Sequence, residues 1–173
     1  MGKRKKPINL LGLIFVVCLI VFSLIYYWVV NNLNETDKDS VKVYFFDGDK
    51  LIGAERRLLS GEVPLEKAMK ELLKGPRQAE AAQGVTTQIP VGTKLIGLTI
   101  KNKLAIVNLN DKIENYGGGS TRLRGMIGQI VYTATNIPGI EKVWIWEEGK
   151  RELVLGGEGL VLDHPLSRVE VSF

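Results

Sequence analysis

The chain has 173 residues and a formal net charge of +4 at pH 7, with one cysteine and one histidine. A single cysteine excludes an internal disulfide and a cysteine metal site, and a single histidine excludes a histidine-rich metal centre. Basic residues stand together at positions 3–6, so the remainder of the chain is close to charge balance. A nucleic-acid binder would carry a strong basic stripe, and we therefore expect no nucleic-acid partner.

An uncharged apolar run at residues 10–30 follows the basic cluster. About 20 apolar residues in a helix span the hydrocarbon core of a bilayer, and Tyr26, Tyr27 and Trp28 suit the membrane interface. The basic cluster favours a cytoplasmic N-terminus. The sequence therefore predicts a cytoplasmic tail at 1–9 and a single-pass transmembrane anchor at 10–30, with the C-terminal part outside the cytoplasm of a cell membrane.

A cleaved signal peptide is the main alternative for this segment. Its apolar region would be about 7–15 residues long and would end at small residues, whereas this run is longer and ends in bulky residues. Cys18 invites comparison with a lipidated cysteine, but Val17 precedes it, where lipoprotein signals usually carry a small residue. We therefore expect an uncleaved membrane helix that contains Cys18 as a small apolar thiol.

Residues 31–40 are polar and charged, which predicts a short linker that holds the following domain near the membrane. Residues 41–173 then have the size of one domain with its own core. At the start of this domain, 41–46 alternate as a strand does, 47–50 form a glycine-containing turn, and 51–59 are predicted as a second strand.

Two amphipathic helices are predicted in this domain. The first begins at Pro64 and ends before Gly75, because proline suits the first helical position and glycine suits the residue after the last. The second follows Ser120 as its N-cap and stops before Pro138. The apolar stripes expected to be buried are Leu65, Ala68, Met69, Leu72 and Leu73 in the first helix and Leu123, Met126, Ile127, Ile130, Val131 and Ala134 in the second.

Short elements are predicted between and after the helices. Asn102 tolerates the left-handed conformation, so it suits a tight turn between two strands. These elements give an α+β fold, in which two amphipathic helices pack on a mostly antiparallel sheet, preceded by one transmembrane helix. The predicted segments are a helical turn at 78–83, a loop at 111–119, and strands at 94–101, 103–109, 143–146, 151–155 and 168–172, the last after a glycine-rich loop.

The sequence offers no catalytic constellation. A Ser/His/Asp triad would need His164, which lies beside Pro165 and is predicted as a surface-loop residue. Glu147 and Glu148 are adjacent at a strand end and point to opposite faces, so they cannot share acid–base work at one bond. We therefore expect a protein that is not an enzyme and that needs no metal or cofactor.

Two clusters are candidate binding sites. Trp144 and Trp146 share one strand face, where they can bind a sugar ring or a protein partner, or fill a second packed layer. A glycine loop before the second helix can bind an anion at the helix N-terminus, although a permissive turn followed by an N-cap is the preferred interpretation. The residues of this glycine-loop cluster are Gly118, Gly119, Ser120 and Arg122.

Several short stretches share their order with a known family. They are Val41-Lys42-Val43-Tyr44-Phe45, Leu72-Leu73-Lys74-Gly75-Pro76, Ile89-Pro90-Val91-Gly92-Thr93-Lys94, Ala105-Ile106-Val107-Asn108-Leu109, Ser120 onward with Gln129-Ile130-Val131-Tyr132-Thr133-Ala134-Thr135, and Val143-Trp144-Ile145. Together they resemble the GerM domain, the sporulation and spore germination module of endospore-forming bacteria. The resemblance covers nearly all of residues 41–173.

The resemblance implies a non-enzymatic α+β module similar to the ring-building motifs of secretion-type channels. It also implies a membrane-anchored envelope protein of a spore-forming bacterium that acts in protein assembly during sporulation or germination. The name-giving member carries two such modules behind a lipoprotein signal, whereas this chain has one module behind the predicted membrane helix.

We therefore expect self-association or an envelope protein partner. A head-to-tail ring needs two different surface patches that meet. One is predicted on the first helix around Lys67, Lys70 and Glu71, and the other near Trp144 and Trp146. The alternative function is a module that binds cell-wall glycan or another small ligand through the tryptophans or the glycine-loop cluster.

Overall fold

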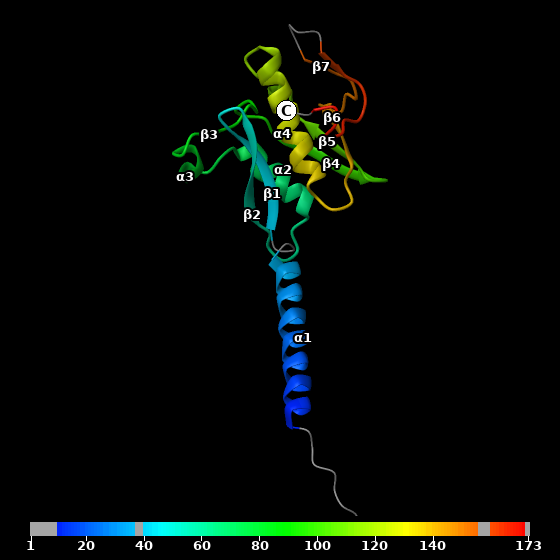
Figure 1. Cartoon of the computed structure of the whole chain (residues 1–173). Coiled ribbons are helices and arrows are strands. Elements are labelled where there is room, and N and C mark those ends of the chain that lie inside the picture. Colours follow the sequence, from blue (N-terminus) through cyan, green and yellow to red (C-terminus); the bar gives the residue numbers. More distant parts are fainter. Residues whose placement is uncertain (1–9, 37–39, 156–159, 172–173) are drawn as a thin grey trace, which may run out of the picture. The chain divides into compact units, whose positions relative to one another are not determined.

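The computed structural model describes residues 10–36, 40–155 and 160–171, and the chain divides into two compact units, Met1–Asp39 and Ser40–Phe173 (Figure 1). In the first unit, helix α1 spans Leu10–Thr36. Among the described residues, no helix is both long enough and apolar enough to cross a membrane. The predicted transmembrane segment at 10–30 is therefore not confirmed by the structure.

Helix α1 also extends into the segment predicted as a linker. It continues through Thr36, and 37–39 lie outside the described residues. Adding residues to an existing helix needs no new nucleation, so a polar segment can continue a helix that the preceding residues have started.

The second unit begins with a three-stranded sheet in the order β2-β1-β3. β1 (Ser40–Asp47) and β2 (Lys50–Arg57) form the predicted antiparallel hairpin, with Asp47 opposite Lys50. Gly48 has a φ of 57°, which the tight turn between them requires. β3 (Val85–Thr86) adds a short antiparallel pairing on the other side of β1.

A second three-stranded sheet has the order β4-β5-β6. β4 (Leu95–Lys101) and β5 (Leu104–Leu109) are antiparallel, and the turn between them places both Asn102 and Lys103 at positive φ. β6 (Lys142–Glu147) is parallel to β5, because the chain crosses from one to the other through a helix. A third sheet consists of the antiparallel pair β7 (Leu153–Leu155) and β8 (Leu160–Leu162). The prediction of one mostly antiparallel sheet is thus corrected: the described part of the domain has three separate sheets, of which the β4-β5-β6 sheet is mixed.

Two long helices cover the core of this unit. α2 (Pro64–Lys74) and α4 (Ser120–Thr135) contact each other and β1, while α2 also contacts β4 and α4 also contacts β6. Shorter helical turns are α3 (Gln78–Ala81) and the 3₁₀ turn η1 (Asp111–Glu114). Both predicted apolar stripes are confirmed, although Leu73 is only half-buried. The α+β class is therefore confirmed.

Three local predictions were wrong or incomplete. The predicted N-cap, Ser120, is the first helical residue of α4, and Gly119 is the N-cap, so no side chain forms a capping hydrogen bond there. The predicted loop at 111–119 contains η1. Residues 168–171 form turns instead of a strand, because backbone bonds within 167–171 and the Glu170 carboxylate satisfy the local backbone groups. The glycine-rich loop at 156–159 lies outside the described residues.

Candidate functional site

Helix α2 presents one of the two predicted interface patches. Lys70 is its most accessible member, with 57% of its side chain exposed, and its Nζ lies 2.6 Å from Oε1 of Glu66, which is 44% exposed. Lys67 is less accessible and donates to Oε1 of Glu62 at 3.1 Å. The exposed part of this patch is therefore the Glu66–Lys70 pair.

Glu71, the third predicted member, belongs to the interior of the domain instead. Only 13% of its side chain is exposed, and it lies 2.6 Å from Lys74, 3.9 Å from Lys67 and 3.6 Å from Nε of Arg56. Burial alone would raise the pKa of Glu71, but the hydrogen bond from Lys74 and the surrounding positive charges outweigh it and lower that pKa. Glu71 is thus occupied within its own chain.

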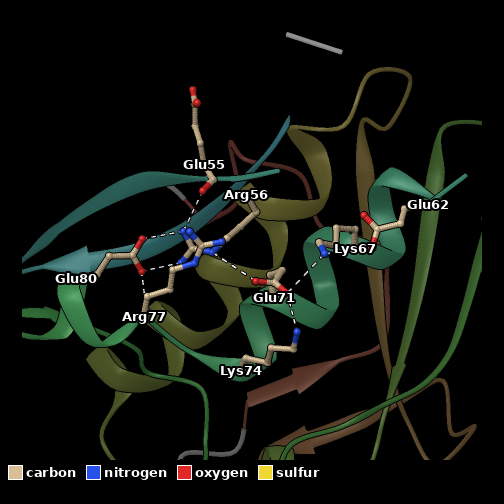
Figure 2. Close-up of polar contacts among 8 residues, drawn as sticks. All are labelled: Glu55, Arg56, Glu62, Lys67, Glu71, Lys74, Arg77 and Glu80. Carbon is tan, nitrogen blue, oxygen red and sulfur yellow. Dashed lines mark hydrogen bonds and ion pairs between the residues drawn. The ribbon is translucent and has the colours of Figure 1, made fainter. Parts of the chain in front are cut away.

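Arg56 is the centre of this charge cluster (Figure 2). It lies on β2 with 1% of its side chain exposed, and its Nη1 and Nη2 donate to the two oxygens of Glu80 at 2.7 and 2.6 Å. Nη1 also donates to the carbonyl of Glu55 at 3.0 Å, and the guanidinium lies 5.5 Å from the ring centroid of Phe45. A two-pronged carboxylate contact of this kind suits the planar guanidinium.

Glu80 connects this arginine to α3. Its Oε2 accepts a second hydrogen bond, from the backbone N–H of Arg77 at 2.7 Å, and so caps the short helix. The hydrogen bond from Arg56 is the main reason that the pKa of Glu80 lies below its ordinary value. The Arg56 cluster therefore holds α2 and α3 against β2.

The sequence did not identify Arg56 or Glu80 as important. Arg56 stands opposite buried Val41 in the β1–β2 register, and its residue type by itself suggests a solvated position. The sequence feature that could have identified Arg56 is its place at a core-facing position of an alternating strand.

The second predicted patch lies on β6. Trp144 and Trp146 are half-buried on one face, with ring centroids 5.6 Å apart in an edge-to-face arrangement. Trp144 Nε1 donates to the carbonyl of Arg151 at 3.1 Å, and the Arg151 guanidinium lies 5.3 Å from the Trp146 ring centroid. The indole N–H of Trp146 is buried and has no hydrogen-bond partner among the described residues. The two rings already pack on each other and on Arg151.

This face of the β4-β5-β6 sheet is turned away from the core. Ile106 and Asn108 of β5 stand opposite Trp144 and Trp146 and are also half-buried, while the alternate residues of both strands are buried. Since α2 and α4 contact the sheet from its core side, the helix patch and the tryptophan patch are two different surfaces of the domain.

Three of the four residues of the glycine-loop cluster line one cleft. Gly118, Gly119 and Arg122 line a cleft of about 440 Å³, and Ser120 is not among its lining residues. Asp49 also lines the cleft, and a carboxylate there opposes an anion. The three consecutive glycines from Gly117 all have positive φ, which supports the turn interpretation.

The remaining candidates are a metal site and the single histidine, His164. In the described part of the chain, no group of three or more His, Cys, Asp and Glu side chains is placed to hold a metal ion. His164 is more than half exposed, as predicted, and contacts Asp163 at 2.7 Å and Glu170 at 3.6 Å. The Asp163 contact is the main cause of a raised His164 pKa.

Residues 42–153 match the family Germane, described as sporulation and spore germination. No curated protein matches the chain. Three similar solved structures share 19–24% sequence identity with the chain and therefore show the fold alone.

One similar structure is the tandem GerMN domains of the sporulation protein GerM from Bacillus subtilis, at 24% identity and a TM-score of 0.58, covering 74% of this chain and 44% of that one. The first GerMN domain of the same protein has 19% identity and a TM-score of 0.62, and the match covers 75% of this chain and 98% of that domain. A protein described as a lipoprotein from Clostridium perfringens has 22% sequence identity and a TM-score of 0.56, and the match covers 76% of this chain and 89% of that one.

The chain thus spans less than half of the tandem GerM structure, while its coverage of the single domain is nearly complete. The order of stretches that suggested the GerM domain from the sequence is confirmed by the family match over most of the second unit. The chain belongs to the Germane family of sporulation and spore germination domains.

Proposed function

We propose that this chain is a non-enzymatic envelope protein whose GerM-type domain is a protein-assembly module in sporulation or germination. Its family is described by those two processes, and similar structures belong to a sporulation protein and to a protein described as a lipoprotein. The observation that carries the assembly role is the outward face of the β4-β5-β6 sheet, where Ile106, Trp144 and Trp146 are only half-buried. Apolar residues grouped on an open face are typical of interfaces.

The α2 patch supplies the second surface that head-to-tail assembly needs. Its accessible part is the Glu66–Lys70 pair, since Lys67 and Glu71 are engaged within the domain. A partner on α2 would meet one positive and one negative group, and the tryptophan face would supply an apolar anchor.

Two substitutions test this proposal in the full-length chain. Trp144→Ala and Lys70→Glu should each reduce self-association, measured by light scattering over a concentration series in mild detergent. Lys112→Glu is the matched control, because Lys112 forms a similar exposed pair with Asp111 at 2.9 Å outside both surfaces. Unchanged self-association of both folded test variants would contradict the proposed interface.

We also propose that α1 holds the chain at a membrane. The support is the uncharged run at 10–30, the basic cluster at 3–6 and the exposed apolar side chains from Ile14 to Val29. The full-length chain should stay with membranes during alkaline carbonate extraction, and its C-terminal domain should be digested by protease added from outside. Release of the chain by carbonate would contradict this anchor.

The glycan-binding alternative has weaker support. A sugar ring stacks on a free aromatic face, whereas Arg151 already lies over Trp146, and the Trp144 and Trp146 rings pack on each other edge to face. Titration with soluble cell-wall fragments should therefore leave tryptophan fluorescence unchanged, and saturable quenching would favour the alternative.

A further inference from the structure

The outer edge of β4 has no partner in the described part of the chain. β4 ends the order β4-β5-β6, and no described segment forms hydrogen bonds along its outer side. Lys101 and Leu104 close the two-residue turn and so exchange backbone hydrogen bonds. By the alternation of an antiparallel ladder, the N–H and C=O groups of Leu98 and Ile100 then point outward.

Two other strand edges of the domain are covered. The outer side of β6 exchanges backbone hydrogen bonds with Leu166, at 2.8 and 2.7 Å from Val143. On β1, the backbone N–H of Tyr44 donates to Oγ1 of Thr133 at 3.0 Å, and its carbonyl accepts from Nε2 of Gln129 at 2.9 Å. Side chains of α4 therefore close the part of the β1 edge that β3 does not reach.

The β2 edge differs from the β4 edge in its side chains. On β2, the carbonyl of Glu55 already accepts a bond from the buried Arg56, and no large apolar side chain of the strand is exposed. On β4, Ile96 is 51% exposed and Ile100 is 52% exposed. Charged residues blunt a free strand edge, whereas exposed apolar residues favour pairing with another chain.

A groove runs beside β4 on its α2 side, with a volume of about 340 Å³. Leu98 borders it, and Ile100 lies two residues further along the strand on the same face. A strand added to this edge would therefore place its inward-facing side chains over the groove. The groove is lined by Glu66, Lys70, Leu95, Ile96, Gly97 and Leu98.

We propose that β4 pairs antiparallel with β4 of a second copy of this chain, with Thr99 on the two-fold axis. Leu98 of each copy then faces Ile100 of the other, so their outward N–H and C=O groups form hydrogen bonds with each other. The same register brings each half-exposed Ile100 to the groove of the other copy. Lys101 faces Gly97, so no like charges stand directly opposite each other. The register also avoids the irregular pairing between Leu95 and Gly97. This two-fold contact is distinct from the head-to-tail contact between the α2 patch and the tryptophan face. It names a second copy of the chain as a partner and rests on the proposed assembly role.

Cysteine cross-linking tests the register. In a Cys18→Ser background, which removes the native thiol, Thr99→Cys places two thiols on the axis, where paired Cα atoms about 4.5 Å apart suit a disulfide. Lys101→Cys is the matched control, because its two copies would lie about 13 Å apart along the strands. We expect at least tenfold more disulfide-linked dimer for Thr99→Cys, on non-reducing gels of the full-length chain in mild detergent.

A second pair of variants tests the groove in the Thr99→Cys background. Ile100→Glu should lower the dimer yield at least fivefold, because it removes the apolar side chain that meets the groove and places a charged carboxylate opposite Leu98 of the other copy. Val91→Glu, at a residue that is 98% exposed and outside β4, should leave the yield unchanged. Equal effects of the two variants would overturn the proposed role of the groove.

Light scattering on the same samples separates this inference from the assembly role. A chain that self-associates while Thr99→Cys and Lys101→Cys cross-link equally would overturn β4 pairing and leave assembly intact; the edge would then be open to an extended segment of another protein. A chain that is monomeric and uncross-linked at all concentrations would overturn both.

Discussion

The two three-stranded sheets of the domain use their polar and apolar residues in opposite ways. At the β2-β1-β3 sheet, buried Arg56 of β2 and buried Gln129 and Thr133 of α4 form hydrogen bonds inside the domain. In the β4-β5-β6 sheet, Ile100 is exposed and Trp144 is half-buried. The difference indicates that the first region fixes the fold, because buried polar groups are costly when unpaired, while the second is available for contacts with other molecules.

The largest effect is expected from breaking the Arg56 cluster. Glu80→Ala removes the two-pronged carboxylate and leaves the buried guanidinium with the Glu55 carbonyl and the longer contact to Glu71, so the free energy of unfolding should fall by about 3 kcal/mol. Urea unfolding followed by circular dichroism measures it. Glu66→Ala breaks the exposed pair with Lys70 and should cost less than about 0.5 kcal/mol. Similar losses for the two variants would contradict the contrast between the regions.

A smaller loss is expected at the α4–β1 contact. Gln129 is fully buried, accepts from the backbone N–H of Gln88 at 2.7 Å and donates to the Tyr44 carbonyl. Gln129→Ala removes a partner from two backbone groups and should cost about 2 kcal/mol in the same unfolding experiment. Gln83→Ala, at an exposed turn residue, should change stability by less than about 0.5 kcal/mol. A neutral Gln129→Ala would show that water replaces these bonds.

The Arg56 cluster also predicts a pH dependence. The pKa of Glu80 is lower in the folded chain than its ordinary value, chiefly through the Arg56 hydrogen bond. Its stabilising contribution is therefore fully present above the unfolded-state pKa and is lost as the pH falls through the folded-state pKa. Below about pH 5, the wild-type chain should lose stability faster than Glu80→Gln. Parallel stability curves for the two proteins would contradict this origin of the shift.

The smallest effect on stability is expected at the β4 edge. Ile100→Thr keeps a β-branched residue on the strand and removes only half-exposed apolar surface, so thermal and urea unfolding should change by less than about 0.5 kcal/mol. The same variant should weaken β4 cross-linking. A loss above about 1.5 kcal/mol would show that this edge stabilises the isolated domain.

Much of the local structure could be predicted from the sequence. The 3.6-residue spacing located the stripes of α2 and α4, and turn residues located the hairpins at Gly48 and Asn102. The weak points were the ends of elements and the tail. At 168–171, backbone bonds and the Glu170 carboxylate favoured turns over the strand that β-branched residues predicted.

The candidate sites were harder to predict. Lys70 lies on an exposed part of α2, as its spacing indicates, and its role in an interface stays a prediction. Glu71 could not be separated from it, because spacing along a helix does not show which carboxylate a distant arginine reaches. The glycine-loop residues were expected to meet at one place, yet Asp49 from the β1–β2 turn also lines that cleft. Contacts between segments far apart in the chain leave no local pattern.

The sequence by itself determined the family, the α+β class and the faces of the helices, since these follow from the order, spacing and conformational preferences of neighbouring residues. Only the tertiary structure decided that Arg56 is buried between Glu80 and Glu71, that β5 and β6 are parallel, and that the described residues leave one edge of β4 unpaired. These features depend on which distant segments pack together, and the energy of a buried charge or a free strand edge is set by that packing.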